Sequence, residues 1–373
     1  MNDSSMQMAE TPSSLLEVVQ RLPTSGARSV AIRSDADGVV LAVAQFAKDV
    51  AGQPPSMHAG DSNLAAPLYR WTDGQFVECG SLPLPGGEQV EFFEIDGRRF
   101  IAGASIRSGR GPYEMDVKCA IYEWIDGARH LLQSFATFGA KQWRHFSIGA
   151  RHFLALAQGV DAPGLQTRHP RTSRIYEWEG SGFKELQVLE GRWGYGWCPF
   201  ELDGQFFLAY ADHLERSVIY RWTGVRFEQF QVIAGGGGRA FAFFRRADRA
   251  WLAFANLQSG VELYRWDGAA FTAHQHLGGP GARALQVLQT AGGLYLVNLN
   301  FIQGTPASPQ VLKQSQLYRW AGDGFELRDT FATSAATDVA GFQSGGSQYL
   351  VVANSLDSDL KFRTDTVVYR FLG

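Results

Sequence analysis

The feature that most constrains this chain is a short aromatic motif, Tyr-x-Trp, that recurs along its length. Six copies begin at Tyr69, Tyr122, Tyr176, Tyr220, Tyr264 and Tyr318, and a seventh reads Tyr369-Arg370-Phe371. Successive copies are 44 to 54 residues apart, which is enough for one four-stranded antiparallel sheet with its turns. The repetition predicts an all-β chain folded as a single seven-bladed β-propeller.

A second repeated pattern lies upstream of each aromatic motif. It is an apolar run that ends in a small polar residue, namely Gln45, Ser105, Gln158, Asp212, Asn256, Asn300 and Asn354. A buried strand that leads into a loop needs a polar side chain there to bond the freed backbone groups. Asp-Gly hairpins precede the runs and Gly-rich turns follow the aromatic motifs, so we expect strands A, B, C and D in each blade, with the apolar run as B and the motif as C.

The last blade needs a strand from the other end of the chain. Only two residues follow the seventh motif, whereas residues 14–23, SLLEVVQRLP, match the D strands elsewhere, such as FKELQVLE at 183–190. An N-terminal strand that completes the last blade (velcro closure) would leave no exposed sheet edge. We therefore expect a propeller over residues 14–373, preceded by a disordered tail at 1–13.

The Tyr-x-Trp strands, the LAxAN-like strands and the Gly-Ala links into strand A resemble the EAR repeat, also called the epitempin or EPTP repeat. The resemblance covers about residues 14–373. The best-known members of that family are the leucine-rich glioma-inactivated proteins, in which the propeller binds cell-surface receptors. The resemblance implies a recognition module.

In those relatives the link into strand A commonly carries an acidic residue that suits a bound cation. The equivalent positions here are Ser29, Gln89, Gln142, Gly196, Arg239, Ala284 and Asp338. Calcium prefers several oxygen ligands, whereas only Asp338 is acidic and Arg239 would repel a cation. We predict no metal and no cofactor.

Several classes of protein are disfavoured by composition. No apolar stretch reaches the length of a membrane-spanning helix, about 18 residues, and residues 1–13 lack the apolar core of a signal peptide. The net charge of −3 is spread along the chain, which attracts neither nucleic acid nor anionic membrane. The three cysteines have no metal-ligand spacing. We expect a cytoplasmic monomer without nucleic-acid or membrane partners.

Loop lengths indicate which face of the propeller binds a ligand. B-to-C and D-to-A connections should emerge on one face, and the B-to-C distances from the strand-end polar residue to the next Tyr vary from 8 to 24 residues. Variable loops on a regular scaffold commonly carry recognition. On this face, Trp193, Tyr195 and Trp197 alternate with small residues, so period-two geometry places all three rings on one side. They could form an aromatic wall for a ligand or simply pack between blades.

Polar residues of the same links add to this candidate site. The residues expected near the upper channel are Glu91, Gln142, Trp143, Arg144, Arg239 and Gln286. His213 follows Asp212 on a short loop, where an acid could orient a general base. The basic loops that contain Arg168 and His169, and Arg107, Arg110 and Tyr113, could hold a carboxylate or phosphate, or meet an acidic partner.

Three functions remain open. The favoured hypothesis is a non-enzymatic module that binds a protein or another ligand, including a small molecule, through the face with the long loops. The alternative is an enzyme that acts on a small molecule in the central funnel, with Glu91, Arg144, Arg239 and His213 as catalytic candidates. The third is a lectin-like binder. The fold alone does not choose among them.

Overall fold

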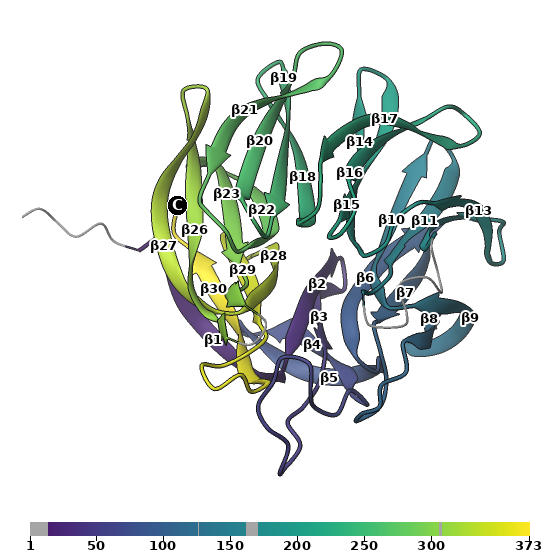
Figure 1. Cartoon of the computed structure of the whole chain (residues 1–373), viewed down its shortest axis with the longest axis vertical. Coiled ribbons are helices and arrows are strands. Elements are labelled where there is room, and N and C mark those ends of the chain that lie inside the picture. Colours follow the sequence, from purple (N-terminus) through teal and green to yellow (C-terminus); the bar gives the residue numbers. More distant parts are fainter. Residues whose placement is uncertain (1–13, 126, 162–170, 306–307) are drawn as a thin grey trace, which may run out of the picture.

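The computed structural model describes residues 14–125, 127–161, 171–305 and 308–373, and it confirms the predicted fold. Seven four-stranded antiparallel sheets surround a central axis (Figure 1), and the described residues contain no helix. The predicted tail at 1–13 lies outside the described residues, so that prediction stays untested.

Within each blade the strands follow the predicted order A, B, C, D from the axis outward. The A strands are β2 (Ala27–Asp35), β6 (Gly87–Ile95), β10 (Ala140–Ile148), β14 (Gly194–Leu202), β18 (Gly238–Arg246), β22 (Ala282–Thr290) and β28 (Ala336–Ser344). The B strands are β3 (Gly38–Gln45), β7 (Arg98–Ser105), β11 (Arg151–Gln158), β15 (Gln205–Asp212), β19 (Arg249–Asn256), β23 (Gly293–Asn300) and β29 (Ser347–Asn354).

The outer strands follow the same scheme. The C strands are β4 (Ala65–Thr72), β8 (Asp116–Ile125), β12 (Ser173–Trp178), β16 (Ser217–Trp222), β20 (Gly260–Trp266), β26 (Leu312–Ala321) and β30 (Arg363–Phe371). The D strands are β5 (Gln75–Pro83), β9 (Ala128–Phe138), β13 (Phe183–Leu189), β17 (Phe227–Ala234), β21 (Phe271–Leu277), β27 (Gly324–Ser334) and β1 (Leu16–Ser25). A small hairpin, β24 (Gln303–Thr305) and β25 (Ser308–Gln310), lies in the B-to-C loop of the sixth blade.

The N-terminal strand closes the ring as predicted. Strand β1 is antiparallel to β30, from Leu16 opposite Phe371 to Ser25 opposite Arg363. Leu16 and Leu22 are buried in two different core clusters. The last sheet therefore joins the two ends of the described chain.

The repeated Trp of the C strands packs between blades. Trp71 of the first blade lies 5.0 Å, between ring centroids, from Phe342 of the seventh blade, and Trp320 of the sixth lies 4.8 Å from Trp251 of the fifth. Such edge-on contacts bury large aromatic surfaces against the neighbouring sheet. This geometry agrees with a structural role for the motif.

The polar residues at the ends of the B strands bond the backbone as expected. The Gln45 amide accepts from the Ser25 N–H (2.6 Å) and donates to the Ala65 carbonyl (3.0 Å). Asn354 likewise accepts from Ser334 and donates to the Asp365 carbonyl. Each side chain thus ties the D-to-A link to the next C strand.

Every A strand begins with a β-bulge, which the sequence did not reveal. The pairing with strand B skips one residue in each blade. The skipped residues, which we call the bulge ring, are Arg28, Glu88, Lys141, Tyr195, Arg239, Arg283 and Thr337. All seven line one narrow cavity of about 90 Å³ in the channel. A bulge re-aims a side chain, and here it turns one residue per blade towards the axis.

Candidate functional site

A larger cavity opens above the bulge ring, and we call it the mouth cavity. Its volume is about 530 Å³, and six of the seven ring residues form its floor. Its walls come from B-to-C loops, which supply Phe46, Met57, Ile106, Leu257 and Phe301, and from D-to-A links, which supply Trp193 and Pro280. The two kinds of connection therefore meet at one end of the channel, as expected.

The predicted aromatic wall is only partly present. Trp193 and Tyr195 line the mouth cavity, with ring centroids 6.2 Å apart, whereas Trp197 is buried in the core and packs on Tyr210 (4.4 Å). The prediction that all three rings share one side was wrong because Tyr195 is the bulged residue, and the bulge breaks the period-two alternation.

The bulge also corrects the proposed equivalence of the link positions. Arg239 occupies the bulge of β18, so the residue equivalent to Gly196 is Ala240 rather than Arg239. Sequence reasoning missed Arg28, Glu88, Lys141 and Arg283 as channel residues. The available signal was their place, directly after a pair of small residues, such as Gly26-Ala27 or Gly281-Ala282.

Some of the charged side chains of the bulge ring form ion pairs, and others do not. The Glu88 carboxylate lies 3.1 Å from Lys141 Nζ and 3.7 Å from Arg28 Nε. Burial raises the pKa of Glu88, but Lys141 and Arg28 outweigh it and hold the pKa below its ordinary value. Within the described part of the chain, neither Arg239 nor Arg283 forms an ion pair with a carboxylate.

Three cations surround the phenol ring of Tyr195. Arg239, Lys141 and Arg283 lie 4.0, 5.0 and 5.4 Å from its centroid. Burial raises the pKa of Tyr195, but attraction to these cations prevails and lowers it to about 8. The cations of the cavity floor thus stabilise the phenolate form of Tyr195 relative to that of a tyrosine in water.

His213 lies on the cavity wall, 5.3 Å from Trp193 and 5.8 Å from Tyr195 between ring centroids. Burial, with the nearby Arg239, lowers the pKa of His213 to about 4. The preceding Asp212 does not bond the His213 ring. Its carboxylate instead accepts the backbone N–H groups of Trp193 and Leu214. The structure shows no Asp212–His213 dyad.

The remaining catalytic candidates lie apart from the mouth. Glu91 is buried and pairs with Arg144 at 3.4 Å, and neither residue lines the mouth cavity. Burial raises the pKa of Glu91 against the opposing effect of Arg144. The four candidates therefore form two groups, with Arg239 and His213 at the mouth and the Glu91–Arg144 pair outside it.

Three further residues that were predicted near the upper channel form hydrogen bonds within the protein. Trp143 is fully buried and its Nε1 donates to the Gly103 carbonyl, so it was wrongly placed at the channel. Gln142 lines the narrow cavity, where its Oε1 accepts the Trp197 N–H at 2.6 Å. Gln286 donates to the neighbouring Val287 carbonyl.

The residues of the second blade that were predicted to hold a carboxylate or phosphate already have partners within the protein. Arg107 donates to Ser62 Oγ and to two loop carbonyls, and its guanidinium lies 3.5 Å from the ring centroid of Tyr113. Arg110 pairs with Asp61 at 2.9 Å, and Tyr113 donates to the Gly60 carbonyl. These residues hold the loops in place. Arg168 and His169 lie outside the described residues.

Among the described residues, no three His, Cys, Asp or Glu side chains gather closely enough to hold a metal ion. In the same part of the chain, no helix has the length and apolar character needed to cross a membrane.

The ring of seven blades, with a loop-walled cavity at one end, makes this chain a seven-bladed β-propeller. The EPTP domain model matches residues 131–179, 182–223 and 324–372. These three segments, which together make up less than half of the chain, are thus similar to the EAR, or EPTP, repeat.

Two relatives carry the same repeat in their names. The chain is 36% identical over 128 residues to the mouse thrombospondin-type laminin G domain and EAR repeat-containing protein, and 29% identical over 149 residues to its human counterpart. These matches cover 34% and 39% of this chain, but only 17% and 21% of the relatives. The similarity thus concerns about a fifth of each relative.

Proposed function

We propose that the chain is a non-enzymatic recognition module that binds a protein partner at the mouth of the propeller. The observation that carries the proposal is the convergence of B-to-C loops from five blades and D-to-A links on one cavity. The match to the EPTP repeat supports a role in protein interaction, and loops on a rigid scaffold suit recognition. The separation of Glu91 and Arg144 from His213 and Arg239 favours binding over acid–base catalysis.

The test compares the two faces with matched substitutions. Gln258→Arg with Thr305→Arg places two bulky charges at exposed positions of the mouth. Thr72→Arg with Gln75→Arg makes the same change at exposed positions of a C-to-D turn. Proteins cross-linked to the chain in its own cells are identified, purified, and titrated against the wild type and both double variants.

We expect the mouth variant to weaken binding by about tenfold or more, because a charge forced into an interface clashes with the partner. The turn variant should bind like the wild type. Equal affinities for all three proteins, or a loss confined to the turn variant, would refute recognition at the mouth.

We also propose a reducing, cytoplasmic location. The free thiols of Cys79, Cys119 and Cys198 support this proposal, since oxidising compartments favour disulfides. Alkylation of the protein in lysed source cells, followed by mass spectrometry, should find all three thiols reduced. A disulfide to any of them would contradict the proposal.

A further inference from the structure

The mouth cavity has a surplus of positive charge. Among the described residues that line it, Arg28, Lys141, Arg239 and Arg283 are cations, and Glu88 is the single carboxylate. Glu88 forms ion pairs with Lys141 and Arg28, whereas its carboxylate acts on Arg239 and Arg283 only from beyond ion-pair distance. The surplus therefore falls on Arg239 and Arg283.

These two arginines are buried without the partners that a guanidinium normally requires. Arg239 is 5% exposed and Arg283 is 9% exposed. Arg239 donates from Nη1 to the Gly238 carbonyl, whereas its buried Nε has no partner among the described residues. Arg283 donates from Nε to the Thr337 carbonyl at 3.3 Å. Each guanidinium carries five N–H donors, and a buried unpaired cation is costly.

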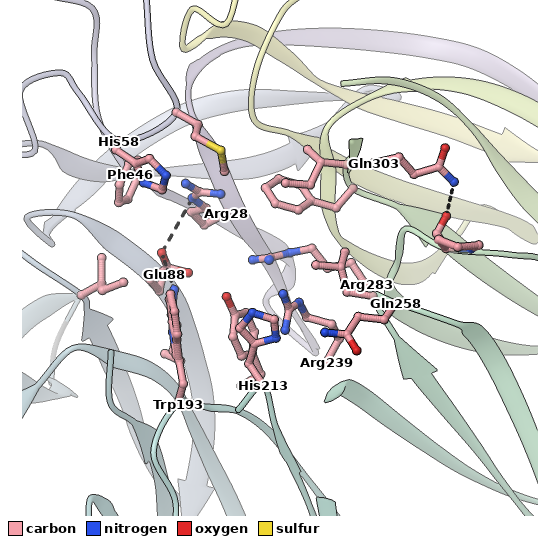
Figure 2. Close-up of a pocket in the computed structure, with 18 of the residues that line it drawn as sticks. Arg28, Phe46, His58, Glu88, Trp193, His213, Arg239, Gln258, Arg283 and Gln303 are labelled. Carbon is pink, nitrogen blue, oxygen red and sulfur yellow. Dashed lines mark hydrogen bonds and ion pairs between the residues drawn. The ribbon is translucent and has the colours of Figure 1, made fainter. Parts of the chain in front are cut away.

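Other unpartnered polar atoms lie on the same cavity. Trp193 Nε1 and His213 Nδ1 are buried without a hydrogen-bond partner in the described part of the chain. Figure 2 shows the guanidinium groups of Arg28, Arg239 and Arg283 turned towards one central space, with His213 beside Arg239. A single group in that space would face several donors.

The upper walls are more apolar than the floor. Phe46, Met57, Leu257, Phe301 and Ile302 line the cavity above the arginines. Phe301 also stacks against Arg283, 4.6 Å from ring centroid to guanidinium carbon. Stacking holds the guanidinium plane in place while leaving its edge free to donate. The cavity thus presents cationic groups that can bind an anion at its floor, and a largely apolar surface at its entrance.

We propose that the mouth cavity binds a carboxylate or phosphate group, carried on an apolar or aromatic body, between Arg239 and Arg283. The group accepts charge-assisted hydrogen bonds from both guanidiniums, and the apolar body contacts the aromatic walls. The inference goes beyond the proposed function, because it concerns the ligand of the cavity itself. The anion can belong to a free small molecule or to an acidic side chain of a protein partner.

Isothermal titration calorimetry with defined probes tests the site. Phenylacetate and phenyl phosphate are the anionic probes, and phenylacetamide is the neutral isostere, all at matched ionic strength near pH 7. We expect the anions to bind at least about tenfold more tightly than the amide. Arg239→Gln and Arg283→Gln should each remove that preference. Arg246→Gln is the matched control, since Arg246 is exposed at the other end of the same strand β18.

A second measurement leaves both arginines unchanged, in case a buried arginine variant fails to fold. The tyrosinate absorbance follows the titration of Tyr195, whose phenolate is favoured by Arg239, Lys141 and Arg283 and opposed by Glu88. A bound anion offsets those cations, so it should raise the midpoint of this titration. Tyr195→Phe identifies the signal. Equal binding of anion and amide, or an unchanged midpoint at saturating phenylacetate, would overturn the anion site.

A peptide arm identifies the source of the anion. The peptide acetyl-Phe-Glu-Phe-amide is compared with its Gln analogue, and preference for the Glu peptide over phenylacetate indicates an acidic side chain of a partner. Preference for phenylacetate indicates a small organic acid. Both results uphold the anion site, whereas equal binding of the Glu and Gln peptides, with no binding of phenylacetate, refutes it. Loss of the partner with intact probe binding would refute only the proposed function.

Discussion

Asp212 shapes the mouth cavity although it does not line it. Its buried carboxylate accepts the backbone N–H groups of Arg192, Trp193, Leu214 and Glu215, and the Tyr210 hydroxyl. The first two donors belong to the D-to-A link, and the next two belong to the B-to-C loop of the same blade. One side chain therefore fixes both segments that present Trp193 and His213 to the cavity.

We predict that Asp212→Ala lowers the free energy of unfolding by about 2–4 kcal/mol, because it leaves buried backbone donors without an acceptor. Urea denaturation followed by far-ultraviolet circular dichroism measures the change. Asp248→Ala is the control, since Asp248 is exposed in an A-to-B turn. An equal effect of the two substitutions would mean that the carboxylate does not organise these loops.

His145 makes the stability of the fold depend on pH. Its ring stacks on Phe93 (4.8 Å) and lies 5.4 Å from His152, and burial followed by the charge of His152 lowers its pKa to about 4. The unfolded chain, with a pKa near 6.5, binds more protons than the folded chain between pH 4 and 6.5. Stability should therefore rise with pH across this window and be lost as the pH falls.

We predict that His145→Phe removes part of that pH dependence, by at most about 3 kcal/mol across the window. Urea denaturation of both proteins at several pH values between 4 and 7 gives the slope. His213, whose pKa is also lowered to about 4, should keep a residual slope in the variant. Identical slopes for the wild type and His145→Phe would contradict the assignment.

At the scale of elements, an amide side chain connects the outer strands of neighbouring blades. Gln187 on β13 donates to the Phe227 carbonyl and accepts the Phe227 N–H, both at 2.8 Å. The same two-way contact recurs at Gln20, Gln133, Gln231 and Gln275, each with the Phe that begins or adjoins the next D strand. These side chains satisfy backbone groups that would otherwise face the gap between blades.

We predict that Gln187→Ala lowers the free energy of unfolding by about 1–3 kcal/mol, since both hydrogen bonds are lost and the backbone of Phe227 is left unpaired. Thermal and urea unfolding provide the measurement. Gln229→Ala is the matched control, because Gln229 is exposed on the adjacent strand β17. If Gln187→Ala left the free energy of unfolding unchanged, water would be replacing the amide without loss of stability.

The same elements show what sequence reasoning could and could not reach. Strand order, the velcro strand and the role of the strand-end polar residues follow from period, apolar runs and turn residues, which are local signals. The bulges are not local in this sense, because a skipped residue appears only when strand A pairs with strand B. Tyr195 and Trp197 were therefore placed on the same side, and Arg28 and Arg283 were not recognised as channel residues.

At the scale of the whole molecule, the cavity exists only because the ring is closed. Arg28 comes from the first blade and Arg283 from the sixth, and the seventh blade separates them. That blade contains β1, so the N-terminal strand and the C-terminal β30 jointly hold the two sides of the mouth at their distance. Stability of the last sheet and shape of the cavity are thus coupled.

We predict that a chain lacking residues 1–25 is largely unfolded or aggregated, whereas a chain lacking only residues 1–13 unfolds within about 2 °C of the full chain. Loss of β1 exposes the edge of β30 and removes the buried Leu16 and Leu22. Burial of each leucine side chain contributes about 1.5–3 kcal/mol to the free energy of unfolding. Together with the lost strand pairing, this loss approaches the whole stability of a domain. Calorimetry and size-exclusion chromatography distinguish these outcomes.

A synthetic peptide of residues 14–25 should restore the truncated chain, because the missing strand can pair with β30 in trans without a covalent link. A scrambled peptide of the same composition is the control. Restoration should return both the cooperative thermal transition and the binding of phenylacetate at the mouth, since Arg28 and Arg283 regain their separation. If the truncated chain melts like the full chain without any peptide, the N-terminal strand is not what closes the ring in solution.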